Sequence, residues 1–247
     1  MPENFHIDMP EAVRNIIHTI EEHGFKAYAV GGCIRDSILG RNPDDWDITT
    51  SAVPSQIKTF FKRTVDTGIA HGTVTIMIDK TGYEVTTYRI DGEYEDGRHP
   101  KSVEFSDRLV DDLCRRDFTI NAMAYNDTDG FVDEFKGLDD LDAKIIRCVG
   151  EPELRFTEDA LRMMRAIRFS AQLGFTINEA TWSAIKKLAP SISKISMERV
   201  HVELGKTLMS AHPDYVAEYS EAGLFEPILP VVDNACLLYT SDAADEE

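Results

Sequence analysis

Residues 28–52 read YAVGGCIRDSILGRNPDDWDITTSA, and this stretch decides the fold expected for the first half of the chain. A short apolar run over 27–30 precedes Gly31–Gly32, a helix-like stretch covers 33–39, and a strand is predicted over 45–49. Side chains two apart in a strand point to the same side. Asp45 and Asp47 are therefore expected to face together at roughly 7 Å, while Trp46 turns inward.

This order of features indicates a phosphate site. Two carboxylates on one strand face suit hard divalent cations and can hold two metal ions ~3.5–4 Å apart for in-line phosphoryl transfer. The glycine pair lets backbone N–H groups approach a phosphate, the helix start behind it favours anions, and Arg35 adds a charged fork. Taken singly, two glycines are usually a plain turn and a DxD is usually a solvated strand end. The prediction of a phosphate site rests on the order in which these features follow one another: strand, glycine pair, helix and strand.

Outward from this stretch, the sequence predicts a mixed α and β region. Apolar residues at helical spacing predict a helix over 11–23 that ends at Gly24. Alternation predicts antiparallel strands over 73–78 and 84–88, and strands or buried segments are expected over 121–125 and 131–135. The polar stretch RIDGEYEDGRHP, residues 89–100, is expected to be a mobile loop.

After residue 152 the pattern becomes helical, with helices predicted over 157–173, 179–189 and 197–209. Thr157 is expected to cap the first of them, with Glu158 and Asp159 in its first turn. Its inward face is expected to consist of Phe156, Ala160, Met163, Ile167 and Ala171. We therefore expect an α+β head over residues 1–150, an all-helical neck over 151–233 and a disordered or non-native tail over 234–247.

The composition excludes several classes of protein. The 247 residues are 43% hydrophobic and 28% charged, which is typical of a globular chain. No apolar run approaches the ~20 residues of a membrane helix, and the polar N-terminus lacks a signal peptide, so no membrane association and a cytoplasmic location are expected. The four widely spaced cysteines are expected to be buried reduced thiols rather than disulfides or zinc ligands: Cys33, Cys114, Cys148 and Cys236.

The net charge of −18 neither suggests nor excludes nucleic acid, because its distribution is uneven. Residues 155–206 hold nine Lys or Arg against five Asp or Glu, so this segment carries +4 and the remainder −22. Arg162, Arg165 and Arg168 recur every three residues in this segment and form a stripe that winds slowly around a helix. A polyanion site and an ordinary solvated face with acidic neighbours explain this stripe equally well.

A second polar motif is CRRDFTINAMAYN, residues 114–126. Its arginines, Asp117 and Asn121 are suited to ribose hydroxyls and a phosphate. An ordinary capped helix start, with Asp117 bonded to nearby N–H groups, explains the same residues, and the residues alone favour it slightly.

The stretch 28–52 resembles the head signature of the class II tRNA nucleotidyltransferases (CCA-adding enzymes) of the polymerase β-like nucleotidyltransferase superfamily. The resemblance implies that Asp45 and Asp47 are the catalytic pair that binds Mg²⁺, and that Gly32 and Arg35 contact the triphosphate. It makes Glu84 the candidate for a third carboxylate, although a merely solvated strand residue explains Glu84 as well.

Two further motifs are similar to motifs of that family. CRRDFTINAMAYN is similar to RRDFTxNA, which implies that Arg116 lies at the nucleotide and that Asp117 and Asn121 position the sugar. TEDALRMMRAIRFSAQLGF, residues 157–175, is similar to the base-selecting motif EDxLRxxRxxRF. It implies that Asp159 and Arg162 read the base, and that the two later arginines, Arg165 and Arg168, serve the triphosphate and the register of the helix.

Hydrogen-bond chemistry makes this base selection reasonable. Aspartate only accepts and arginine only donates. Cytosine and adenine each present an amino donor beside a ring-nitrogen acceptor, whereas uracil and guanine present a keto acceptor beside an N–H donor. Two buried mismatches at roughly 1–3 kcal/mol each would give discrimination on the order of 10²–10⁴.

Three more strings bear on the subtype. RIDGEYEDGRHP is like the flexible loop DGxYxDxRRP of enzymes that add the terminal A, with His99 where arginine is more usual. TGIAHGTVTI, residues 67–76, is like the CCA-adding pattern, and KISMERVHVEL, residues 194–204, resembles the last family motif. His71 and His201 are expected to be structural.

The resemblance implies template-independent addition of C and A to the tRNA 3′ end from CTP and ATP, with release of pyrophosphate. The implied partners are tRNA, CTP, ATP and Mg²⁺, with no DNA and no membrane. An A-adding or poly(A) polymerase and an inactive RNA 3′-end-binding fragment remain alternatives. Members of the family usually continue into body and tail domains that grip tRNA, and this sequence stops before them.

Overall fold

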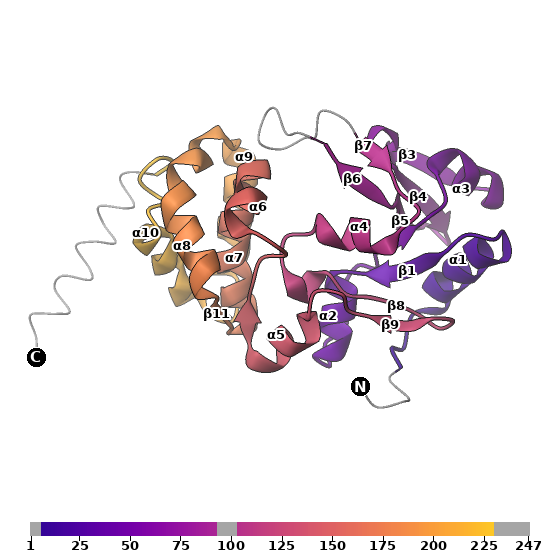
Figure 1. The fold of residues 1–247 in the computed structure, drawn as a ribbon, viewed down its shortest axis with the longest axis horizontal. Coiled ribbons are helices and arrows are strands. Elements are labelled where there is room, and N and C mark those ends of the chain that lie inside the picture. The colour runs from indigo at the N-terminus through magenta and orange to yellow at the C-terminus, as the bar shows by residue number, and fades with distance from the viewer. Residues whose placement is uncertain (1–5, 93–102, 230–247) are drawn as a thin grey trace, which may run out of the picture. The chain divides into compact units, whose positions relative to one another are not determined.

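The computed structural model describes residues 6–92 and 103–229 (Figure 1). Contacts within the chain divide them into two compact units, one of residues 6–92 with 103–141 and one of residues 142–229. No helix in the described part of the chain is long and apolar enough to cross a membrane.

The first unit combines a sheet with helices. Its helices are α1 (Glu11–Glu22), α2 (Gly32–Ile38), α3 (Pro54–Phe60), α4 (Leu109–Cys114) and α5 (Gly137–Ala143), with the 3₁₀ turns η1 (Ile69–His71) and η2 (Thr119–Asn121). Its strands are β1 (Ala27–Val30), β2 (Ile48–Thr50), β3 (Thr64–Gly68), β4 (Thr73–Ile78), β5 (Thr81–Thr87), β6 (Arg89–Asp91), β7 (Val103–Phe105), β8 (Ala124–Asn126) and β9 (Gly130–Val132).

Seven of these strands form one mixed sheet in the order β3-β4-β5-β2-β1-β8-β9. The pair β2 and β5 is parallel, and every other neighbouring pair is antiparallel. All four residues of β1 are buried, as both faces of the central strand are covered, and α1 and α2 pack against it. This mixed sheet with helices, followed by a helical region, confirms the predicted fold class.

The two aspartates lie just before β2 rather than within it. The strand predicted over 45–49 is wrong at its start, because β2 begins at Ile48 and the preceding residues contribute one backbone bond, from Val30 N–H to the Asp47 carbonyl at 3.0 Å. The alternation nevertheless holds, with Trp46 buried between exposed Asp45 and Asp47.

Most other predictions for the first unit are confirmed. The helix expected over 11–23 is α1, followed by Gly24 at φ +86°, and β4 and β5 form the expected antiparallel pair. The expected strand 131–135 is shorter, because β9 ends at Val132. The loop expected over 89–100 begins with strand β6, paired with β7, while residues 93–100, with His99, lie outside the described residues. Cys33 and Cys148 are buried, but Cys114, expected to be buried, is exposed.

The second unit is mainly helical. Its helices and short strands are β10 (Ile145–Ile146), α6 (Pro152–Glu158), α7 (Leu161–Leu173), β11 (Thr176–Ile177), α8 (Glu179–Leu188), η3 (Ala189–Lys194), α9 (Met197–Leu208), η4 (Pro213–Val216) and α10 (Ala217–Glu221). Helix α7 packs against α9, and α6 packs against α8 (Figure 1). Residues 142–229 share contacts in this unit, in which β10 pairs with β11. The boundary between head and neck expected near Gly150 stays a prediction. The tail 234–247, with Cys236, lies outside the described residues.

The helix predicted over 157–173 is interrupted. Helix α6 ends at Glu158 and α7 begins at Leu161, because Asp159 adopts an extended conformation at φ −143°, ψ +105°. Thr157 is not a cap, since it lies inside α6 and donates to the Glu153 carbonyl at 2.8 Å. The predicted inward set is confirmed as buried: Phe156, Ala160, Met163, Ile167 and Ala171.

Candidate active site

The turn between β1 and α2 requires glycine for two reasons. Gly31 has φ +87° and ψ −130°, a conformation that side chains disfavour. A Cβ built on Gly31 would also lie 2.8 Å from Nη1 of Arg116. The guanidinium of Arg116 therefore lies directly against the glycine turn, so that the structure brings together two of the motifs recognised in the sequence.

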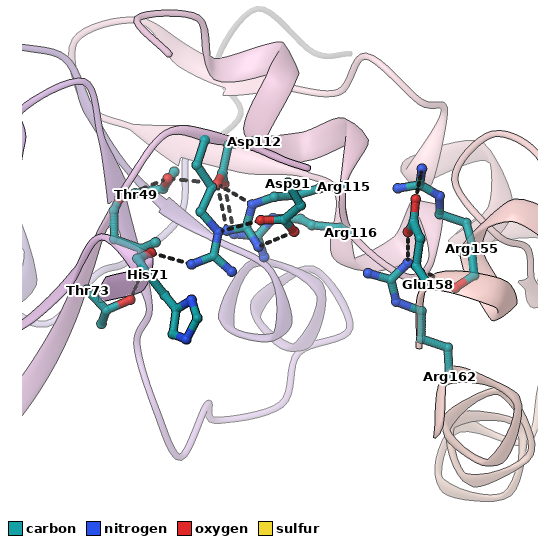
Figure 2. Close-up of polar contacts among 12 residues, drawn as sticks. Thr49, His71, Thr73, Asp91, Asp112, Arg115, Arg116, Arg155, Glu158 and Arg162 are labelled. Atoms are coloured by element: carbon teal, nitrogen blue, oxygen red, sulfur yellow. Dashed lines mark hydrogen bonds and ion pairs between the residues drawn. The ribbon is translucent and has the colours of Figure 1, made fainter. Parts of the chain in front are cut away.

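A buried carboxylate holds Arg116 in this position (Figure 2). Asp112 is fully buried and accepts from Nη2 of Arg116 at 3.2 Å, from Arg115 at 2.7 and 2.9 Å, and from the Thr49 hydroxyl at 3.1 Å. Burial alone would raise the pKa of Asp112. The charges and hydrogen bonds of the two arginines outweigh it and hold the pKa below its usual range. Asp112 thus ties Arg116 to β2, the strand that follows Asp47.

Three acidic side chains gather at one end of the parallel pair β2 and β5. Ile48 is in register with Val85, which places Asp47 and Glu84 at corresponding positions on adjacent strands. Loss of hydration raises the pKa of Asp47; the Arg116 charge opposes this shift and the Asp45 charge adds to it. Loss of hydration also raises the pKa of Glu84, and the charges of Asp47 and Asp45 raise it further. These carboxylates therefore repel one another, and a bound cation would relieve that repulsion.

The donor set suits magnesium better than a metal enclosed by protein. Among the described residues, no three His, Cys, Asp or Glu side chains come close enough to hold a metal ion by themselves. Mg²⁺ commonly binds through one or two carboxylates and takes its other ligands from water and substrate phosphates. Asp45 and Asp47, both exposed, offer that kind of open site.

Arg35 belongs to a neighbouring polar network. Its buried guanidinium donates from Nη1 to Asn121 at 2.6 Å and from Nε and Nη2 to Asp36 at 2.9 and 2.8 Å. Asn121 in turn donates to Asp117 at 3.0 Å, and Asp117 accepts from the backbone N–H of Phe118 at 2.8 Å. The structure thus links the predicted triphosphate contact to the two predicted sugar contacts through side-chain hydrogen bonds.

In the second unit, Asp159 and Arg162 engage different partners. Asp159 lies in the break between α6 and α7, and its two carboxylate oxygens accept from Arg199 of α9 at 2.8 and 3.3 Å. Arg162 donates to Glu158 at 2.7 Å and to the Arg155 carbonyl at 3.2 Å (Figure 2). The two predicted base-reading side chains are therefore each oriented by another charged residue.

The other two arginines of the stripe differ in burial. Arg168 is 6% exposed; it donates to Glu203 of α9 at 2.5 Å and to Gln172 at 2.8 Å, and its guanidinium lies 3.9 Å from the ring centre of Phe169. Arg165 is more exposed, and its Nη1 lies 4.0 Å from Oε1 of Glu203. Arg168 thus joins α7 to α9, whereas Arg165 has more of its surface in solvent.

Three site residues escaped the sequence analysis: Asp112, Arg199 and Glu203. Each carried a weak signal. Asp112 stands three and four positions before Arg115 and Arg116, and Arg199 and Glu203 are four apart in KISMERVHVEL, a spacing that puts them on one helix face. Their partners across the fold could not be assigned from that spacing.

Comparison with protein families gives two matches. Residues 27–147 match the family model of the poly A polymerase head domain. Residues 174–236 match the model described as the probable RNA and SrmB-binding site of polymerase A. The first match includes both head motifs, and the second includes Arg199 and Glu203.

Several known proteins similar to this chain are described as CCA-adding enzymes. The CCA-adding enzyme of Limosilactobacillus reuteri (strain DSM 20016) is 49% identical over 230 residues, which cover 91% of this chain and 56% of that protein. The crystal structure of Bacillus stearothermophilus CCA-adding enzyme in complex with CTP superposes with a TM-score of 0.80 at 43% identity and covers 87% of this chain and 52% of that one. The structure of the Thermotoga maritima CCA-adding enzyme complexed with tRNA_CCA superposes with a TM-score of 0.75 at 26% identity. This match covers 91% of this chain and 54% of that one. The chain thus spans about half the length of these relatives.

Proposed function

Because this chain belongs to the nucleotidyltransferase family of the poly A polymerase head domain, whose similar members are named CCA-adding enzymes, we propose that it adds C and A to the 3′ end of tRNA. The substrates are CTP and ATP, and pyrophosphate is the second product. The observation that carries this proposal is the group of three carboxylates, Asp45, Asp47 and Glu84, at one end of the β2–β5 pair, beside a glycine turn covered by Arg116.

In this proposal the first unit is the catalytic head. Asp45 and Asp47 would hold Mg²⁺, with Glu84 beside them as a further acceptor. Bound magnesium lowers the pKa of a hydroxyl and stabilises charge on a transferring phosphate. Gly32, Arg35 and Arg116 would contact the nucleotide's phosphates, and the Arg35 network would bring Asp117 and Asn121 to the ribose.

The reaction is an in-line displacement. The terminal 3′-hydroxyl of tRNA loses its proton as its oxygen bonds to the α-phosphorus, and the bond from that phosphorus to the β-bridging oxygen breaks, which releases pyrophosphate. Arg116 stays in place throughout, because buried Asp112 fixes its guanidinium. A preorganised cation of this kind stabilises developing charge without reorganisation.

The second unit is the nucleotide-selecting neck in this proposal. Asp159 would accept from the amino group of cytosine or adenine, and Arg162 would donate to the ring nitrogen beside it. Arg165 would serve the triphosphate. For Arg168, burial against Glu203 supports the other part of its expected role, holding the register of α7 against α9.

The test uses three tRNA transcripts that end at the discriminator base, at C, or at CC. Each is incubated with the protein, Mg²⁺, CTP and ATP, and product lengths are read on a sequencing gel. Growth of all three to one common CCA end is the expected result.

The other outcomes separate the alternatives. Extension of the CC transcript alone means an A-adding enzyme, and an open-ended ladder means a poly(A) polymerase. No extension and no pyrophosphate release mean a fragment that at most binds RNA 3′ ends. The cytoplasmic location expected from the sequence stays a prediction.

A further inference from the structure

The carboxylate of Asp159 is held by three donors. Oδ1 accepts from the backbone N–H of Leu161 at 3.0 Å and from Nη1 of Arg199 at 3.3 Å, while Oδ2 accepts from Nη2 of Arg199 at 2.8 Å. The side chains of Asp159 and Arg199 are 16% and 23% exposed, so their ion pair is largely shielded from water. Paired contacts of this kind fix the plane of the carboxylate as well as its charge.

The hydrogen bonds of Asp159 leave part of its carboxylate free to accept from a ligand. An ionised carboxylate has about four lone-pair positions, two on each oxygen. Leu161 and Arg199 together occupy both positions on Oδ1 and one on Oδ2. Asp159 is thus left with one acceptor position, on Oδ2, in a fixed direction.

Arg162 does not compete for that position. The guanidinium of Arg162 donates to Glu158 and to the Arg155 carbonyl (Figure 2). Within the described residues, the ion-pair partner of Asp159 is Arg199. The donor that orients Asp159 therefore comes from a different helix than the donor proposed to read the base.

We infer that Arg199 is a specificity-determining positioning residue, which holds Asp159 so that its one open acceptor position meets an amino group of the base. This inference rests on the proposed function. Without Arg199 the carboxylate can rotate and offer oxygens in other directions, including toward the ring N–H of uracil. Loss of Arg199 therefore weakens the rejection of UTP more than it weakens the binding of CTP.

The experiment measures dissociation constants of CTP, ATP and UTP for the intact chain by competition, together with single-nucleotide incorporation into a tRNA that lacks CCA. The variants are Arg199→Met, which removes the donors, and Arg199→Lys, which keeps the charge but not the fork. Lys206→Met is the matched control, since it removes one positive charge from an exposed position of the same helix. Circular dichroism and thermal unfolding check the fold of each.

The expected result is a fall of about tenfold in the preference for CTP over UTP in Arg199→Met, a fall of about threefold in Arg199→Lys, and no change in Lys206→Met. If Arg199→Met does not fold, the Arg199→Lys value decides. An unchanged CTP to UTP ratio in a folded Arg199 variant overturns the inference, and so does an equal loss of all three nucleotides. A wild-type chain that does not prefer CTP to UTP instead overturns the proposed function.

Discussion

The carboxylates of the head site and those of the neck differ in how they are paired. At the head site, lost hydration raises the pKa of Asp47 and of Glu84, the charge of Asp45 adds to both shifts, and the charge of Asp47 adds to that of Glu84. Asp45, Asp47 and Glu84 form no ion pair within the described residues. In the neck, Asp159 pairs with Arg199 and Glu203 pairs with Arg168. The carboxylates of the head site thus lack an ion-pair partner among the described residues, as the proposed Mg²⁺ site requires, whereas arginines neutralise Asp159 and Glu203 of the neck and hold them in fixed directions.

The strongest test of the head is removal of one carboxylate. Asp47→Ala is expected to lower nucleotide incorporation at least about 1,000-fold, or about 4 kcal/mol in the barrier, because the metal loses a ligand. CTP binding should stay within about threefold, since it rests on other residues as well. Single-turnover extension and equilibrium binding measure the two quantities. Asp66→Ala, which removes an exposed acid paired with Lys58, is the control. Retained turnover would remove the assignment.

The neck is tested by breaking its buried ion pair. Arg168→Met leaves Glu203 charged and buried, so the free energy of unfolding is expected to fall by about 3–5 kcal/mol. Denaturant unfolding followed by circular dichroism measures it. Lys187→Met, which breaks an exposed pair with Glu153, should cost about 1 kcal/mol or less. Equal losses in the two variants would show that the neck does not depend on its buried pair.

Base selection tests whether the orientation of neck side chains matters. Asp159→Ala is expected to raise UTP incorporation relative to CTP by about 10- to 100-fold, since the mismatch between the carboxylate and uracil is removed. Competition between the two nucleotides on one tRNA measures the ratio. Glu198→Ala, at an exposed position of α9, is the control. Complete exclusion of UTP in Asp159→Ala would contradict the template role of this pair.

Metal binding tests the repulsion within the head. At a Mg²⁺ concentration about five times the dissociation constant, the wild-type head should gain about 1 kcal/mol of stability, and Asp47→Asn should gain none. Since the pKa values of Asp47 and Glu84 are raised, their charged forms destabilise the metal-free protein as the pH rises through those values. The gain from Mg²⁺ should therefore fade as the pH is lowered through the same range. Thermal unfolding with and without Mg²⁺, from pH 4 upward, measures both effects; a pH-independent gain would contradict them.

The smallest expected effect is on stability and concerns Glu218, an acid of the neck that, unlike Asp159 and Glu203, is not paired with an arginine in the part of the chain that the structure describes. Burial, together with Glu221 and Asp214, raises the pKa of Glu218 to about 7, and its buried Oε2 has no hydrogen-bond partner among the described residues. A raised pKa gives stability that is present below the unfolded value and lost as the pH rises through the folded value. Solvent screening of this half-buried carboxylate reduces the effect of the pKa shift on stability. Glu218→Gln should therefore be more stable than wild type by about 1 kcal/mol at pH 8 and equal to it near pH 4.

Denaturant unfolding at the two pH values measures this difference. Glu226→Gln, an exposed acid nearby in the sequence, should show no change at either pH. A stability difference that does not depend on pH would mean that Glu218 acts through packing rather than through its charge.

Sequence reasoning worked best where near neighbours decide the structure. The period of apolar residues located α1 and the inward face of α7, and alternation placed Trp46 inside with Asp45 and Asp47 outside. It failed at Asp159, where a helical pattern runs through a break. The apolar positions before and after the break are all buried, from Phe156 in α6 to Ala160 and Met163, so the break left no trace in the apolar spacing.

The sequence by itself determined the order of the motifs, the family they resemble and the candidate residues for metal, phosphate and base, because these depend on residue type and short spacing. The tertiary structure alone decided which charges far apart in the sequence meet. Asp159 and Arg199 are 40 positions apart, and Asp47 reaches Glu84 only through the parallel pairing of β2 with β5. The strength of an ionic interaction depends on the distance between the charges and on their shielding from water in the folded chain, and the local sequence predicts neither quantity.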